Sequence, residues 1–244
     1  MIASKSLRLR RQSVVLWRFE PEMIIAEQKP LKEIREMIAP YKKVLVVGCG
    51  TCVTVCLSGG EKEVGVLSST LRLADAVDGN EREIIEQTIT RQCENEFLEQ
   101  LKENIEKVDA VLSLGCGVGV QDIAALYPDK IVLPGLNTTS FGRPLEQGVW
   151  VEECAGCGDC ILDETGGICP IARCAKNLLN GPCGGSHGGK CEISDDTPCA
   201  WALVYERLGR LGKLKTLAEV KPAKNWSTSL HGGPRKMVRE DLRK

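Results

Sequence analysis

The sequence predicts an α/β protein, with an open, doubly wound and mostly parallel sheet followed by a small cysteine-rich, loop-rich domain. In the first half of the chain, short apolar runs that end in glycine alternate with amphipathic stretches of helical period, which is the pattern of repeated strand–helix units. In the second half, eight of the 13 cysteines fall between Cys154 and Cys199. The predicted boundary between the two parts lies at residue 148.

Residues 23–147 are expected to form the α/β domain. Leu31, Ile34 and Ile38 recur at helical spacing and stop before a proline, which predicts a first helix. The apolar run over 43–48 ends in glycine, as is typical of a buried parallel strand. The remaining predicted elements are a helix over 61–76, a strand over 84–90, a helix over 97–108, a strand over 110–114, a short helix over 120–126 and a strand over 130–133.

Residues 148–212 form the predicted cysteine-rich domain, and they have little capacity for a hydrophobic core. Long apolar side chains are few in this segment and glycines are many. Short helices are expected over 171–179 and 200–211. Because such a segment could hardly fold by hydrophobic burial alone, bound metal is expected to supply the missing stabilisation. Residues 213–244 follow as a charged tail.

Composition argues against several classes of function. The formal net charge is −1 with 27% charged residues, so neither nucleic acid nor a membrane surface is an expected partner. The apolar run after Arg10-Arg11 is shorter than the ~7–15 residues of an export signal, and no stretch approaches the ~20 apolar residues of a membrane span. An odd number of cysteines, 13, fits a reducing cytoplasm better than a closed disulfide framework. Residues 1–22 are expected to be a disordered extension or to precede a true start at Met23.

The cysteine-rich segment opens with a motif of known chemistry. Cys154, Cys157 and Cys160 have the C-x2-C-x2-C spacing with which ferredoxin-type proteins hold a cubane iron–sulfur cluster. Five more thiols follow, at Cys169, Cys174, Cys183, Cys191 and Cys199. Eight thiolates are the number that two 4Fe–4S clusters require. Zinc sites of paired C-x2-C units fit the spacing less well, disulfides are a third alternative, and the spacing leaves open which thiols share a cluster.

Four further cysteines follow the ends of three predicted strands. They are Cys49 and Cys52 after the first strand, Cys93 after the second and Cys116 after the third. Because the carboxyl ends of parallel strands meet at one edge of a sheet, these thiols are expected to converge on a third metal site, either a 4Fe–4S cluster or zinc. The alternatives are buried thiols in the core, which is how we interpret Cys56, and a nucleotide loop, whose glycine pattern is incomplete here.

Three stretches of the chain resemble the MetV-type iron–sulfur partner subunit of methylenetetrahydrofolate reductase. They are residues 42–67 (KKVLVVGCGTCVTVCLSGGEKEVGVL), residues 153–192 (ECAGCGDCILDETGGICPIARCAKNLLNGPCGGSHGGKCE) and residues 222–227 (PAKNWS). The resemblance implies a non-catalytic subunit of a hetero-oligomer, which relays electrons through its clusters from an electron donor protein or subunit.

The partner implied by the resemblance is a flavin-bearing catalytic subunit of TIM-barrel type, which reduces 5,10-methylenetetrahydrofolate to 5-methyltetrahydrofolate in one-carbon metabolism and anaerobic CO2 fixation. The tail over 213–244 is then a candidate docking segment for that partner, with a disordered tail as the alternative. Two other hypotheses stay open: a scaffold subunit stabilised by zinc or by a cluster without a redox role, and an independent ligand-binding α/β enzyme.

Overall fold

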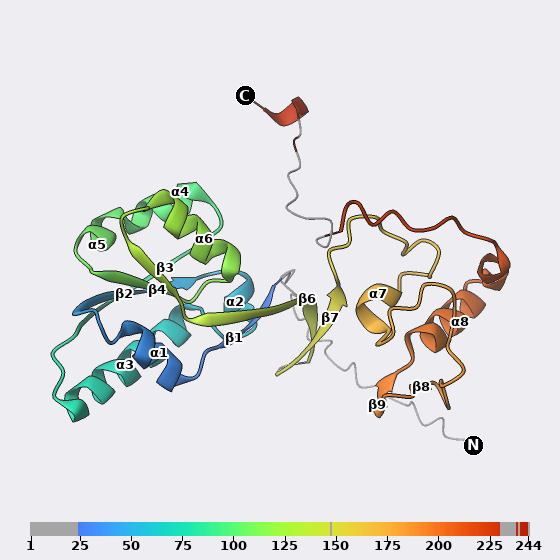
Figure 1. Cartoon of the computed structure of the whole chain (residues 1–244), viewed down its shortest axis with the longest axis horizontal. Coiled ribbons are helices and arrows are strands. Elements are labelled where there is room, and N and C mark those ends of the chain that lie inside the picture. The colour runs from blue at the N-terminus through green and yellow to red at the C-terminus, as the bar shows by residue number, and fades with distance from the viewer. Residues whose placement is uncertain (1–23, 147, 230–237, 239, 244) are drawn as a thin grey trace, which may run out of the picture.

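The chain is described from a computed structural model that covers residues 24–146, 148–229, 238 and 240–243, so the extension expected over 1–22 lies outside the described residues. A four-stranded parallel sheet has the order β3-β2-β4-β5 (Figure 1). Its strands are β2 (Lys43–Cys49), β3 (Glu83–Ile89), β4 (Ala110–Ser113) and β5 (Ile131–Pro134). This sheet and the loop-rich, cysteine-rich part that follows it confirm the predicted fold class.

Helices cover both faces of the sheet, as the doubly wound prediction requires. Helices α1 (Leu31–Ile38) and α3 (Glu61–Asp78) lie on one face, and α4 (Asn95–Leu98), α5 (Lys102–Glu106) and α6 (Gly117–Leu126) lie on the other (Figure 1). The helix expected over 97–108 forms as α4, a 3₁₀ turn η1 (Glu99–Leu101) and α5. The side chain of Gln87 in β3 donates to the carbonyl of Gln100 at 2.9 Å, so a hydrogen bond joins the strand to this turn.

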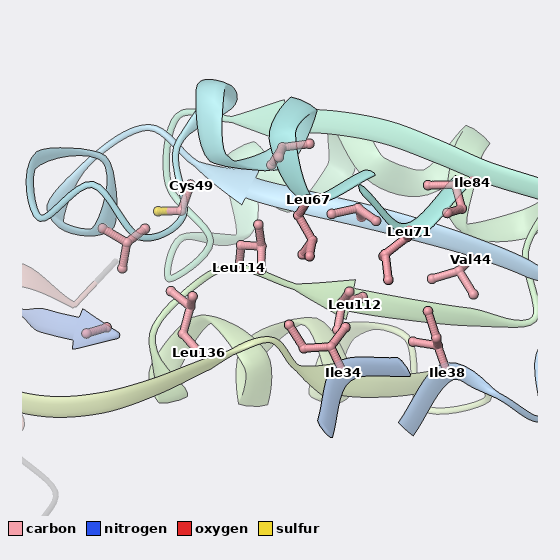
Figure 2. Packing of buried hydrophobic residues seen from close by; sticks show 14 of the residues in the cluster. Ile34, Ile38, Val44, Cys49, Leu67, Leu71, Ile84, Leu112, Leu114 and Leu136 are labelled. Carbon is pink, nitrogen blue, oxygen red and sulfur yellow. The ribbon is translucent and has the colours of Figure 1, made fainter. Parts of the chain in front are cut away.

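The apolar runs of the strands are buried because the sheet is covered on both faces. Val44 and Val46 of β2 pack with α1 and α3, whereas Leu45 and Val47 of the same strand pack with the helices of the opposite face. Figure 2 shows the first of these clusters, with Ile34 of α1 against Leu112 of β4 and the sulfur of Cys49 at its end. The two larger hydrophobic clusters of the described residues therefore lie in the α/β domain.

A second, antiparallel sheet was not predicted. Its strands β1 (Ile25–Gln28), β6 (Leu136–Glu146) and β7 (Val149–Cys154) have the order β1-β6-β7. The chain therefore continues as a strand directly after the proline and glycine that were expected to close the α/β sheet. Strand β6 is long and mostly exposed, and it leads from the α/β domain toward the cysteine-rich part (Figure 1).

The cysteine-rich part contains little regular structure. It holds α7 (Pro170–Arg173), the hairpin β8 (Lys190–Cys191) and β9 (Ser194–Pro198), and α8 (Ala200–Arg210), and the 3₁₀ turns η2 (Leu214–Ala218) and η4 (Glu240–Leu242) follow. The helix expected over 171–179 is wrong beyond Arg173, because Cys174 adopts an extended backbone and Asn177 a left-handed one. The helix expected over 200–211 is confirmed as α8. In the part of the chain that the structure describes, no helix is long and apolar enough to cross a membrane.

Candidate functional site: two groups of cysteines

Four of the eight cysteines in the second half line one small pocket. They are Cys174, Cys183, Cys191 and Cys199. Cys174 ends α7, Cys191 lies in β8, and Cys199 follows β9 directly, so the β8–β9 hairpin places the last two close together. A bond from the amide of Cys199 to the carbonyl of Gly189 (2.8 Å) closes the hairpin. Segments that are distant in sequence thus bring four thiols to one place.

Cys199 is the most buried thiol of this group, with 8% of its surface exposed. It is the N-cap residue of α8. Burial raises the pKa of its thiol. Hydrogen bonds from the Ser186 hydroxyl and from the backbone N–H groups of Ala202 and Trp201 together lower the pKa by more than burial raises it, so the pKa lies below its ordinary value. A helix N-terminus stabilises a thiolate in this way, and the thiolate is the form that binds metal.

Basic side chains also line the pocket of Cys174, Cys183, Cys191 and Cys199. Arg173 lies 3.5 Å from Glu153, and Lys176 forms an ion pair with Glu192. The carboxylate of Glu192, with a smaller contribution from the Cys183 thiol, raises the pKa of Lys176. Four sulfur donors in one pocket suit a thiophilic metal, so the donor set fits an iron–sulfur cluster.

The other four cysteines flank a loop and a short helix. Cys154 ends β7, Cys157 and Cys160 follow in the loop, and Cys169 is the N-cap residue of α7. Because α7 packs against β7, the two ends of this segment are held near each other. Cys154 and Cys160 are exposed. Among the described residues, no group of three or more His, Cys, Asp or Glu side chains, this group included, is placed closely enough to hold a metal ion.

Residues 222–229, which we name the strap, lie on the loop of the first cysteine motif. The Lys224 ammonium bonds the Asp159 carbonyl and lies 3.5 Å from its carboxylate, and the Asn225 amide donates to the same carboxylate at 3.1 Å. The Thr228 hydroxyl donates to the carbonyl of Cys157 at 3.1 Å. Gly158 has φ +80° and a Cβ there would lie 2.7 Å from Thr228, so only glycine suits this close approach.

A role of the strap in the site was not predicted from the sequence. The PAKNWS stretch over 222–227 contributes to the family resemblance, but it has no motif that indicates contact with the cysteine loop. The Lys224 side chain is 3% exposed and its ammonium lies 5.3 Å from the centre of the Trp226 ring, so its buried charge is shared between the Asp159 carboxylate and that ring. Lys224 therefore fixes the strap to the loop between Cys157 and Cys160.

Replacing Lys224 with methionine is expected to loosen that loop. Hydrogen bonds to a charged group are worth about 1.5–3 kcal/mol, so amide exchange over residues 157–160 should rise about tenfold or more. Hydrogen-exchange mass spectrometry measures this rise, with Lys215→Met as the control because Lys215 is exposed. Equal exchange in the two variants would show that other contacts hold the strap.

The cysteines of the α/β domain lie at the carboxyl edge of the parallel sheet. Cys49 is the last residue of β2 and is buried, Cys52 begins the short helix α2 (Cys52–Val55), Cys93 follows β3, and Cys116 is the N-cap residue of α6. Burial raises the pKa of Cys93, and the neighbouring thiols of Cys116 and Cys49 raise it further. The structure thus places these three thiols within electrostatic reach of one another.

Cys56, at the end of α2, is buried in the core, as expected. It belongs to the buried cluster that includes Val53 and Leu136. Its sulfur lies 3.2 Å from the Ser58 hydroxyl and 3.6 Å from the carbonyl of Ala26. Cys56 therefore serves as a matched control for substitutions of the other thiols.

The fold and its cysteine groups define the chain as a doubly wound α/β protein with an appended cysteine-rich module. Residues 133–227 match the family model described as "Methylene-tetrahydrofolate reductase C terminal". The match includes the β6–β7 hairpin, all eight cysteines of the second half and the strap as far as Ser227, so this part of the chain is similar to that family. The parallel sheet up to β5, with Cys49 and Cys116, precedes the match. Searches of curated proteins and of solved structures gave no match.

Proposed function

We propose that this chain is an electron-transfer iron–sulfur subunit of a methylenetetrahydrofolate reductase complex. It relays electrons to the flavin of a separate catalytic subunit, which reduces 5,10-methylenetetrahydrofolate to 5-methyltetrahydrofolate. The observation that carries the proposal is that all eight cysteines of the second half lie in the segment related to these reductases, and that four of them line one pocket. When bound, 4Fe–4S clusters supply one-electron storage to such a complex.

The arrangement of the cysteines supports a division into two clusters. Cys174, Cys183, Cys191 and Cys199 hold one cluster, because they share a pocket. The remaining four thiols, Cys154, Cys157, Cys160 and Cys169, hold the other. Trp201 donates from its ring N–H to the carbonyl of Leu178 at 2.9 Å and forms an apolar wall of the shared pocket. This wall keeps water away from the thiolate of Cys199.

The chain's own residues hold and orient the clusters, whereas the flavin and the folate bind to the partner. Arg173 and Lys176 line the pocket of one cluster, and each is paired with a carboxylate, of Glu153 and of Glu192. Asp159 beside the first motif is likewise paired with Lys224. The charged side chains close to each proposed cluster are therefore largely balanced, so these charges alone do not order the two reduction potentials.

Metal and sulfide analysis of anaerobically purified chain tests the proposal. About four irons with matching sulfide are expected for each cubane, and dithionite reduction should give an EPR signal. Cys199→Ala and Cys157→Ala should each remove about four irons and different parts of that signal, whereas Cys56→Ala should remove none. If Cys199→Ala and Cys157→Ala abolished the same signal, the division of the thiols would be wrong.

The scaffold hypothesis makes a different forecast for the same sample. Zinc without sulfide at the eight cysteines would leave the chain as a metal-stabilised scaffold and would end the electron-transfer proposal. With clusters present, the decisive measurement mixes reduced chain with the oxidised flavin subunit and follows flavin absorbance. Flavin reduction that Cys199→Ala slows supports the relay, and an unchanged rate contradicts it.

A further inference from the structure

The carboxyl edge of the parallel sheet lies at a topological switch point. After β2 the chain passes through α3 to β3 on one side, and after β4 it passes through α6 to β5 on the other side. Doubly wound proteins bind their ligands in the crevice between two such neighbouring strands. Here the residues at this crevice are Cys49 at the end of β2 and Cys116 after β4.

One buried side chain ties together the three loops that carry the thiols. Gln92 is 1% exposed, donates to the carbonyl of Val47 at 3.0 Å and accepts from the Ser113 hydroxyl at 2.6 Å. The Ser113 hydroxyl in turn accepts from the amide of Gly115 at 3.1 Å. A Cβ on Gly115 would lie 2.3 Å from the Gln92 amide oxygen, so glycine is needed there. The network therefore connects the ends of β2 and β4 to the loop after β3.

The amide nitrogen and oxygen of Gln92 and the hydroxyl of Ser113 each have a hydrogen-bond partner, and buried networks of that kind fix one arrangement of the chain around them. Gln92 directly precedes Cys93, and Gly115 directly precedes Cys116. Val47, whose carbonyl Gln92 binds, lies two residues before Cys49. A single amide thus sets the positions from which three thiols project.

We infer that Cys49, Cys52, Cys93 and Cys116 form a tetrathiolate metal site at this edge, with Gln92 as its positioning residue. Four sulfur donors without a carboxylate or imidazole select a thiophilic metal, either zinc or the iron of a cluster. Cys49 is buried, Cys52 and Cys116 are half-buried, and Cys93 lies in an exposed loop, so Cys93 is the ligand that closes over the metal.

The four cysteines precede the segment related to methylenetetrahydrofolate reductases, so this site goes beyond the proposed function and can fail without it.

Metal analysis of single variants tests the inference. Cys93→Ala and Cys116→Ala in the full chain should each lose one equivalent of zinc, or about four irons, while the EPR signal of the Cys154–Cys199 segment stays unchanged. Cys56→Ala is the matched control and should lose nothing. Cys93 is exposed, so its substitution tests the site even if Cys116→Ala does not fold. Full metal content in Cys93→Ala, or loss of all metal together, would overturn the proposal.

The role of Gln92 has its own readout. Gln92→Ala should weaken metal binding by about 10–100-fold, as losses of supporting residues around metal sites do. Chelator competition measures that change, and far-UV circular dichroism shows whether the variant is folded. If a folded Gln92→Ala variant kept the affinity of the unaltered chain, Gln92 would have no positioning role.

Discussion

Replacing Asp75 with alanine is expected to destabilise the α/β domain by about 3–5 kcal/mol, because the change leaves a buried guanidinium without its counterion. Arg82 donates to both carboxylate oxygens of Asp75, at 2.9 and 3.0 Å, and the two side chains are 8% and 5% exposed. Arg82 also donates to the carbonyl of Tyr41 at 3.0 Å. The pair therefore joins the end of α3 to the starts of β2 and β3.

Hydrogen exchange of the β2 and β4 amides measures this effect in the domain concerned. Exchange through unfolding should accelerate about 100-fold or more in Asp75→Ala. Asp78→Ala is the control, because Asp78 pairs with Arg35 at the surface, with side chains 45% and 37% exposed, and exposed pairs contribute about 1 kcal/mol or less. Similar exchange in Asp75→Ala and Asp78→Ala would show that burial of the Arg82 pair contributes nothing.

The parallel sheet was predictable because its signals are local. Val44 to Val47 form an apolar run, and Ile34 and Ile38 stand one helical turn apart, so each element shows its own period. Strand β6 shows no such signal: it is mostly exposed, and only Leu136 is buried. Its pairing with β1 joins Ile25 to Ser140, and nothing in either segment alone specifies a partner that distant.

The cysteines of the candidate site could be listed from the sequence, but their arrangement could not be predicted from it. Cysteine spacing indicated metal chemistry, yet the grouping of Cys174 with Cys199 depends on the path of the chain through the β8–β9 hairpin. Gln92 is a glutamine without any motif, and its importance follows from burial and from its two hydrogen bonds. Lys224 likewise belongs to no motif, and its role in holding the strap follows from its ion pair with Asp159.

Removing metal from the anaerobically purified chain is expected to unfold the cysteine-rich part and to leave the α/β domain folded. The buried side chains of this part form one small cluster, with Trp201, Val204 and Leu208 on α8 and Cys199 at its start. Such a cluster cannot offset the conformational entropy of ordering some 60 residues, because fixing the backbone of each residue costs about 1–2 kcal/mol. Metal–thiolate bonds of the proposed clusters are expected to supply the remaining stability, as in small metal-dependent domains.

The measurement is hydrogen exchange before and after chelation under reducing conditions. Amides of β8, β9 and α8 should lose protection entirely, whereas those of β2 and β4 should keep it, because the aliphatic side chains of two buried clusters cover both faces of that sheet. The result also separates the metal of the cysteine-rich part from the proposed edge site, because loss of metal from the edge site is expected to disturb only the loops around Gln92. Retained protection in α8 after complete metal removal would mean that its apolar face suffices, and the cysteines would then serve electron transfer without serving the fold.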